Sequence, residues 1–207
     1  MNYTIQKIVC GAYQENAYLL LPDGRDDCVL IDPGDDIMAL RRALATSGRR
    51  LSAMLLTHGH FDHMLSAQSL QAETDAPVLV HALDRDMLCD ASKNAYDAMC
   101  SSQPSPAHIE TQTYGETVGV CGMKFSVMHT PGHTQGSVCL YDADNATLFS
   151  GDTLFCAGFG RVDLFGGSPR EMRASLRTLF ALPADTRVLP GHGIETTLAH
   201  ERARYNL

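Results

Sequence analysis

The stretch Thr57-His58-Gly59-His60-Phe61-Asp62-His63 places three histidines and one aspartate within six consecutive residues. It follows an apolar run over 51–56 and precedes a helical pattern over 64–73, so these side chains crowd a loop between a strand and a helix. Imidazole nitrogens combined with a carboxylate suit zinc, iron or manganese, whereas calcium and magnesium prefer ligand sets made only of oxygens. The stretch therefore predicts a site for a divalent transition metal.

Further candidate ligands lie in turns farther along the chain. They are His133 in Thr130-Pro131-Gly132-His133-Thr134, Asp152 in Ser150-Gly151-Asp152-Thr153, and His192 in Pro190-Gly191-His192-Gly193. Each turn is marked by Gly or Pro and follows a predicted strand, where the backbone is free to project a side chain from the edge of a sheet. Together with the first stretch they supply enough ligands for two metal ions.

The pattern of elements points to a layered α/β fold. Apolar runs and alternating patterns predict strands over 3–9, 17–21, 28–31, 51–56, 77–80, 124–128, 137–141, 147–150 and 187–189. Helical patterns cover 37–45, 64–73 and 84–88, and a capped helix begins after Ser168. A long polar excursion over 92–108 separates the two groups of elements. Strands and helices followed by strands and helices again predict two sheets packed face to face, with helices outside.

Composition restricts the class of protein. The chain has 207 residues, with no repeat and no linker, so we expect one domain over 1–207. A net charge of −8 without runs of Lys or Arg argues against nucleic acid and membrane surfaces as partners. The 7 cysteines include no CxxC pair, and the N-terminal residues do not resemble a signal peptide. Reduced thiols and a cytoplasmic location follow as expectations.

The ordered motifs around these ligands strongly resemble those of the metallo-β-lactamase-fold hydrolases, and within them the glyoxalase II-like group. The resemblance also covers Glu15-Asn16-Ala17-Tyr18-Leu19-Leu20 and Leu30-Ile31-Asp32-Pro33-Gly34. It implies a single αββα sandwich with a two-metal site on one edge.

The same resemblance implies a role for each ligand. It assigns His58, His60 and His133 to one metal, Asp62, His63 and His192 to the other, and Asp152 to both as a bridge. The metals would be two divalent ions, zinc in the first place, with iron or manganese as alternatives. A hydroxide held between them would be the nucleophile, which makes Asp62 and Asp152 the catalytic carboxylates.

Comparison within this broad family favours a small thioester or related ester as the substrate. Zinc β-lactamases have a cysteine among their ligands where this chain has Asp152, and lactonases have a tyrosine at the position of Phe155. Arg161 matches a basic residue with which glyoxalase II holds glutathione, although Asp163 replaces a nearby aromatic residue and the chain ends at Leu207 without the usual C-terminal helical domain. An S-lactoylglutathione-type substrate is compatible with these residues, but glutathione specificity stays open.

Two other functions stay open at this stage. Persulfide dioxygenases resemble glyoxalase II and use one iron, for which His58, His133 and Asp152 would be the ligands here. A non-catalytic metal-binding module, or a zinc site that only connects loops, is the third alternative. All of the ligand positions of a two-metal hydrolase are present, which favours the hydrolase.

Several residues outside the ligand set have two interpretations. Asp32 could accept a hydrogen bond from a metal-bound histidine or form an Asx turn. Arg161 could contact the substrate or pair with Asp163 at the surface. His129 could orient a ligand, but a histidine satisfied within its own loop is the simpler expectation. A homodimer could complete the pocket that a missing C-terminal domain would otherwise cover.

Overall fold

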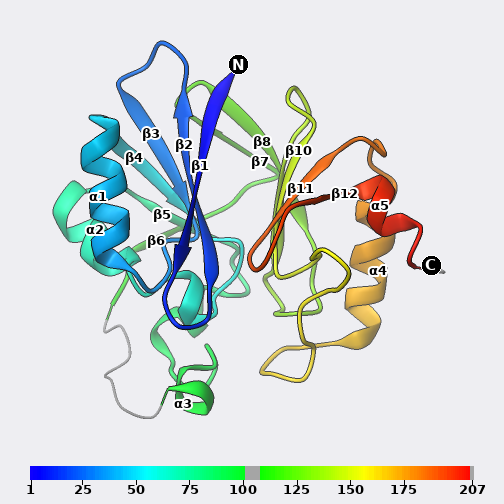
Figure 1. Cartoon of the computed structure of the whole chain (residues 1–207). Coiled ribbons are helices and arrows are strands. Elements are labelled where there is room, and N and C mark those ends of the chain that lie inside the picture. The colour runs from blue at the N-terminus through cyan, green and yellow to red at the C-terminus, as the bar shows by residue number, and fades with distance from the viewer. Residues whose placement is uncertain (101–107, 206–207) are drawn as a thin grey trace.

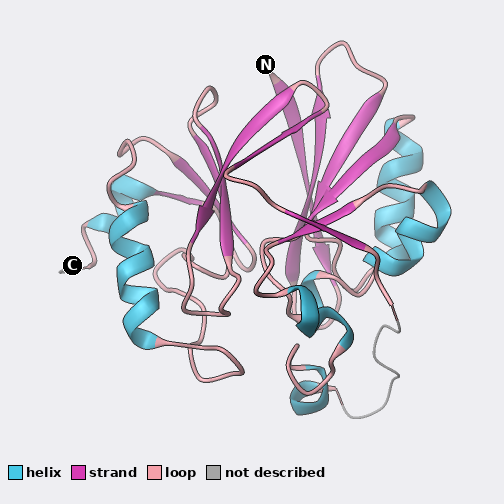
Figure 2. Cartoon of the chain, turned by 180° about the vertical axis from the view of Figure 1, so that it is seen from behind, coloured by secondary structure: helices cyan, strands magenta, loops and turns pink. Residues whose placement is uncertain are grey.

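The structure is a computed structural model that describes residues 1–100 and 108–205. Two six-stranded sheets lie against each other, and helices α1 and α2 cover one outer face while α4 and α5 cover the other (Figure 1). Figure 2 shows the same four layers from behind. This αββα arrangement confirms the predicted fold class.

The first sheet has the strand order β1-β2-β3-β4-β5-β6. Its strands are β1 (Tyr3–Cys10), β2 (Glu15–Pro22), β3 (Asp27–Ile31), β4 (Arg50–Leu55), β5 (Val78–Val80) and β6 (Thr111–Thr113). The strands from β1 to β3 pair antiparallel and those from β3 to β6 pair parallel. The helical segments of this half are α1 (Ile37–Ser47), η1 (Phe61–His63), α2 (Ala67–Thr74), η2 (Arg85–Cys89) and α3 (Tyr96–Met99).

The second sheet has the order β12-β11-β10-β9-β8-β7. Its strands are β7 (Thr117–Val120), β8 (Met123–His129), β9 (Val138–Asp142), β10 (Thr147–Gly151), β11 (Arg187–Pro190) and β12 (Thr196–Thr197). Its helices are α4 (Pro169–Leu179) and α5 (Leu198–Arg202). All neighbouring strands pair antiparallel except β10 and β11, which pair parallel.

Each sheet is buried on both faces, which explains why its central strands read as continuous apolar runs. In β3, Val29 and Ile31 pack between the two sheets, whereas Cys28 and Leu30 pack against the helix layer. A third cluster fills the space between the second sheet and α4. No helix within the described residues is both long enough and apolar enough to span a membrane.

The structure corrects some predicted boundaries. The helix predicted over 64–73 begins only at Ala67, after the 3-10 turn η1. The Ser66 backbone N–H donates to Pro33 O at 3.0 Å, and this contact holds the preceding segment against another loop. The segment predicted as a helix over 84–88 is the 3-10 helix η2. The excursion over 92–108 contains α3, while its part over 101–107 lies outside the described residues.

The sequence patterns did not predict β6, β7, β12, α3 and α5. Each of these elements has five residues or fewer, so too few positions exist for a periodic pattern to emerge. The start of α4 is as predicted, since the Ser168 side chain accepts a hydrogen bond from the Glu171 backbone N–H.

Candidate metal centre

Loops from both halves of the fold meet at one edge of the sandwich and bring all seven predicted ligands into one cluster. The loop after β4 carries His58, His60, Asp62 and His63, whereas His133, Asp152 and His192 follow β8, β10 and β11. Their ligand atoms form overlapping groups within which all atoms lie within 4.8 Å of one another. The polypeptide segments that supply them are up to 134 residues apart in sequence, since His58 and His192 both contribute.

Three histidines form the first group. His60 Nδ1 lies 2.8 Å from His133 Nε2, and the ring centroid of His58 lies 4.9 Å from that of His60 and 4.8 Å from that of His133. All three side chains are buried. His58 Nε2 is buried and has no hydrogen-bond partner among the described residues. We call this group site 1.

The second group combines a carboxylate with two histidines. His192 Nε2 lies 3.3 Å from Asp62 Oδ2 and 3.3 Å from His63 Nε2, and His63 Nε2 lies 3.9 Å from Asp62 Oδ2. His63 is fully buried, whereas the His192 side chain is 25% exposed and borders the solvent. We call this group site 2.

Asp152 lies between the two sites. Its Oδ2 is 3.4 Å from His133 Nε2 of site 1, and its Oδ1 is 3.4 Å from His63 Nε2 of site 2. Oδ1 is buried without a hydrogen-bond partner among the described residues. A buried carboxylate oxygen and a buried imidazole nitrogen without partners are costly unless a cation neutralises them. The donor set therefore fits a pair of metal ions that share Asp152.

The second ring nitrogen of most ligands is held by the surrounding protein, as is usual for metal-binding histidines. His133 Nδ1 donates to Arg161 O at 2.7 Å, and His192 Nδ1 donates to Tyr13 O at 3.1 Å. These contacts direct the Nε2 atoms toward the cluster. The backbone carbonyl of Arg161 thus orients a ligand, a role that no side-chain pattern could indicate.

Asp32 orients the ligands of the first loop. Its Oδ2 lies 3.1 Å from His63 Nδ1 and accepts a hydrogen bond of 2.7 Å from Thr57 Oγ1, which in turn lies 3.1 Å from His58 Nδ1. Its Oδ1 accepts from the Thr57 backbone N–H at 2.7 Å. Of the two interpretations of Asp32, the structure supports the hydrogen bond to a ligand histidine.

Burial and charge set the protonation of the ligands. Burial lowers the pKa of His58 and His60 well below the usual value, and the neighbouring imidazoles lower it further, so both rings are neutral and ready to bind a metal. Burial acts in the same direction on His63, but the carboxylates of Asp62 and Asp152 outweigh it and raise the pKa of His63 to about 10. The carboxylates around His63 therefore supply negative charge that favours bound cations.

Glycines allow the ligand loops to approach closely. A Cβ atom on Gly191 would lie 2.3 Å from Asp152 Oδ1 and 2.6 Å from His63 Cε1. A Cβ atom on Gly160 would lie 2.1 Å from Asp152 O and 2.9 Å from His133 Nδ1. Any side chain at these positions would displace a ligand.

A cavity of about 190 Å³ opens onto the cluster. Its apolar lining comes from Tyr13, Phe61, Ala95, Met99, Phe155 and Leu164. Arg161 also lines it, and this half-exposed guanidinium binds Asp163 through two hydrogen bonds of 2.8 Å. The structure thus shows the predicted pairing with Asp163 and places Arg161 at the edge of the pocket, while its contact with a substrate stays a prediction.

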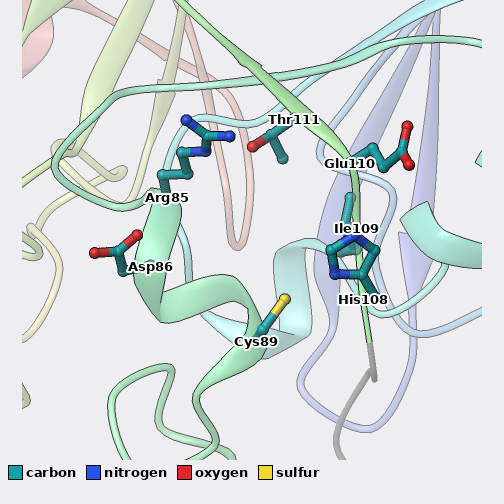
Figure 3. Close-up of a pocket in the computed structure, with 7 residues that line it drawn as sticks. All are labelled: Arg85, Asp86, Cys89, His108, Ile109, Glu110 and Thr111. Atoms are coloured by element: carbon teal, nitrogen blue, oxygen red, sulfur yellow. The ribbon is translucent and has the colours of Figure 1, made fainter.

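A larger cavity of about 630 Å³ lies elsewhere, between η2 and the start of β6 (Figure 3). Its lining includes Arg85, Cys89, His108 and Glu110 but none of the candidate ligands. His129 also lies outside the centre, because its Nε2 binds Gln135 O at 2.8 Å and its ring stacks on His81 at 4.3 Å. That is the loop-satisfied histidine expected from the sequence.

The sequence patterns assigned no role to Asn16 and Asp84, although both are buried beside ligand loops. Asn16 lies within a motif that contributed to the resemblance, which was the available signal. Asp84 directly precedes η2, and only its contacts in the folded chain distinguish it from a turn aspartate.

Comparisons with known proteins place these features in context. Residues 10–192 match the family model described as the metallo-beta-lactamase superfamily. A hydroxyacylglutathione hydrolase of Pseudomonas entomophila is 38% identical over 201 residues, which cover 96% of this chain and 69% of that protein.

Two solved structures superpose over nearly the whole chain. The BLEG-1 B3 metallo-beta-lactamase has a TM-score of 0.90 and 35% identity, with 97% of both chains covered. TTHA1623 in a di-iron-bound form has a TM-score of 0.85 and 40% identity, with 95% of this chain and 96% of that chain covered.

Proposed function

The chain belongs to the metallo-β-lactamase superfamily, and on that basis we propose that it is a metal-dependent hydrolase that cleaves a thioester or a related ester. Two divalent ions, zinc in the first place, would be held by His58, His60, His133 and by Asp62, His63, His192, with Asp152 between them. The proposal includes the glyoxalase II-like reaction, for which an S-lactoylglutathione-type thioester is the model substrate.

The observation that carries the proposal is the position of Asp152. Its Oδ1 lies 3.4 Å from His63 Nε2 of site 2, and its Oδ2 lies 3.4 Å from His133 Nε2 of site 1. Two bound cations would lower the pKa of a water molecule toward ~7 and polarise the substrate carbonyl, so no serine or cysteine nucleophile is needed. The carboxylates of Asp62 and Asp152 would accept hydrogen bonds from the attacking water and orient it.

The pocket supports an acyl substrate with an anionic group. Apolar side chains such as Phe61, Met99 and Phe155 line the cavity and would exclude bulk water from the scissile bond. Arg161 offers a cation at its edge, held in place by Asp163. The hydroxyacylglutathione hydrolase among the relatives supports a thioester, whereas the BLEG-1 structure makes a β-lactam a substrate to be tested.

A mononuclear-iron persulfide dioxygenase is the second candidate. His133 Nε2 lies 3.4 Å from Asp152 Oδ2, and the buried His58 Nε2 is unpaired among the described residues, which is the ligand set such an enzyme would use. The di-iron-bound form of TTHA1623 supports iron as a metal for this fold. A small-molecule substrate, a cytoplasmic location, a homodimer and the absence of nucleic-acid or membrane partners remain predictions.

One experiment separates these candidates. The protein is produced with controlled supplies of zinc and iron, its metal content is measured, and it is assayed for thioester cleavage, for β-lactam cleavage and for oxygen uptake with glutathione persulfide. Two metals per chain with thioester turnover support the proposal. One iron per chain with sulfite formation establishes the dioxygenase instead, preferential β-lactam cleavage overturns the substrate class, and metal binding without any turnover identifies a binding module.

A further inference from the structure

Both metal sites combine ligands from the two halves of the fold. Site 1 takes His58 and His60 from the first half and His133 from the second, and site 2 takes Asp62 and His63 from the first half and His192 from the second. The spacing within each site therefore depends on how a loop of one half is held against a loop of the other. Buried hydrogen bonds hold segments of the two halves together beside each site.

Asp84 makes this contact beside site 1. Its side chain is fully buried, and its Oδ2 accepts hydrogen bonds from the Gly59 backbone N–H at 2.9 Å and from Thr134 Oγ1 at 2.6 Å. Its Oδ1 accepts from the Gly136 backbone N–H at 2.6 Å. Gly59 lies between the first two ligands of site 1, and Thr134 directly follows the third ligand. One carboxylate thus connects both loops of site 1.

The surrounding residues are built around this carboxylate. A Cβ atom on Gly136 would lie 2.6 Å from the carboxyl carbon of Asp84, so this approach requires a glycine. Ser137 Oγ lies 2.7 Å from Thr134 Oγ1 and accepts from the Thr134 backbone N–H at 3.1 Å, which holds the hydroxyl in place. All three partners of the Asp84 side chain are hydrogen-bond donors, so both of its terminal atoms must be acceptors, as in a carboxylate.

Asn16, on β2 of the first half, holds the His192 turn, through which the second half supplies its ligand to site 2. Its Nδ2 donates to Pro190 O at 2.9 Å and to Gly193 O at 3.0 Å, and its backbone N–H donates to Gly191 O at 2.7 Å. These carbonyls lie on both sides of His192 in the chain. The side chain of Asn16 is 1% exposed and serves two acceptors, so it must supply donors.

We propose that Asp84 and Asn16 are separate positioning residues, Asp84 for site 1 and Asn16 for site 2, so that the two metal sites can be weakened independently. The inference rests on the two-metal centre of the proposed function. The Asp84 side chain binds the segment after β4, which carries ligands of both sites, and the turn after His133, which serves site 1. Among the described residues, the hydrogen bonds of the Asn16 side chain go to the His192 turn of site 2.

The test exchanges one atom at each position. Asp84→Asn places an amide donor against N–H and O–H donors, and Asn16→Asp places a carboxylate against two carbonyl oxygens, with side-chain size preserved in both. Metal-free protein is titrated with Co²⁺, and the visible absorption spectrum and chelator competition report binding at each step. The variants His192→Ala and His133→Ala supply reference spectra for Co²⁺ in site 1 and in site 2.

We expect Asp84→Asn to weaken site 1 by roughly 10- to 100-fold, so that the spectrum after the first equivalent matches that of His133→Ala. Asn16→Asp should weaken site 2 by a similar factor and give the spectrum of His192→Ala. Asp142→Asn is the matched control, because Asp142 is a buried acceptor whose partners, Tyr3 Oη and the Asp144 backbone N–H, are not part of the ligand loops. It should keep both sites.

Several outcomes would overturn the inference. Separate positioning is contradicted if either variant loses both sites equally, or if both variants bind metal as the wild type does. It is also contradicted if Asp84→Asn weakens site 2 and Asn16→Asp weakens site 1. If a swap prevents folding, Asp84→Ser and Asn16→Ala remove the contacts without repulsion and answer the same question. A wild-type chain that binds only one Co²⁺ refutes the two-metal centre itself, which distinguishes that failure from the failure of the positioning roles.

Discussion

Asp32 Oδ2 lies 3.1 Å from His63 Nδ1, on the side of the ring that faces away from the metal cluster. The same oxygen accepts a hydrogen bond from Thr57 Oγ1, which contacts His58 Nδ1. Asp32 thereby orients one ligand of each site, in contrast to Asp84 and Asn16. Its backbone has a φ of 48°, in the left-handed region, and this conformation directs the carboxylate toward the ligand loop.

We expect Asp32→Asn to lower the affinity of both metal sites by roughly 10- to 100-fold, because an amide orients an imidazole N–H less strongly than a carboxylate does. Asn tolerates the left-handed conformation, so the backbone should be kept. Chelator competition measures the change. Asp36→Asn serves as the control, since Asp36 caps α1 and Asn caps helices equally well. A loss confined to one site would contradict the dual role of Asp32.

Replacing Asp152 with Ala should abolish hydrolysis and reduce the metal content, because its carboxylate lies 3.4 Å from histidine nitrogens of both sites. Metal analysis of the purified variant and a thioester assay measure both effects. Asp163→Ala, which removes an exposed carboxylate from the same region, should keep both metals. Near-normal turnover in Asp152→Ala would refute the bridging role.

Gly191→Ala should also reduce metal binding, although residue 191 is not a ligand. Its Cβ would lie 2.3 Å from Asp152 Oδ1, so either the carboxylate or the turn must shift. Overpacking of this kind costs about 1–3 kcal/mol of unfolding free energy. Gly158→Ala is the control, since a Cβ atom there meets nothing within 4 Å. Urea unfolding and metal analysis test the prediction, and full metal content in Gly191→Ala would count against it.

Arg161→Ala should raise KM for an anionic thioester by roughly tenfold, or ~1.4 kcal/mol, and leave KM for a neutral thioester nearly unchanged. The backbone carbonyl that orients His133 remains in this variant, so kcat should change little. Steady-state kinetics with the two substrates measure the difference. Arg187→Ala, which removes an arginine paired with Glu195, provides the control. An equal change for both substrates would argue against a charge contact.

Tyr3 connects the two sheets, because its hydroxyl donates to Asp142 Oδ2 at 2.7 Å. Burial first, and then the hydrogen bond to Asp142, raise the pKa of Tyr3 above the usual value. The protonated tyrosine therefore stabilises the folded state fully below pH ~10, and this contribution is lost as the pH rises above the unfolded-state pKa.

Tyr3→Phe should consequently lower the unfolding free energy by about 1–2 kcal/mol at pH 8. The difference from the wild type should shrink above pH ~10, since the variant has no hydroxyl to ionise in the unfolded state. Urea unfolding at several pH values measures both free energies. Parallel pH profiles for the two proteins would contradict this assignment.

Much of the fold could be predicted from local patterns. The apolar run of β3, the amphipathic pattern of α1 and the Ser168 cap of α4 are local signals, and each appears in the structure near its predicted place. Boundaries shifted where another loop intervened, as at Ser66, and elements of five residues or fewer had too few positions to show a period.

The sequence by itself determined which side chains are available for metals, because ligand chemistry is a property of residue type and His-x-His-x-Asp-His is concentrated in one loop. Only the tertiary structure decided how they are arranged. The contacts of Asp152 with His63, of Asp84 with Thr134 and of Asn16 with Pro190 join residues from opposite halves of the chain. Such contacts depend on the packing of the two sheets, and a contact between residues 50 to 174 positions apart leaves no local pattern in the sequence.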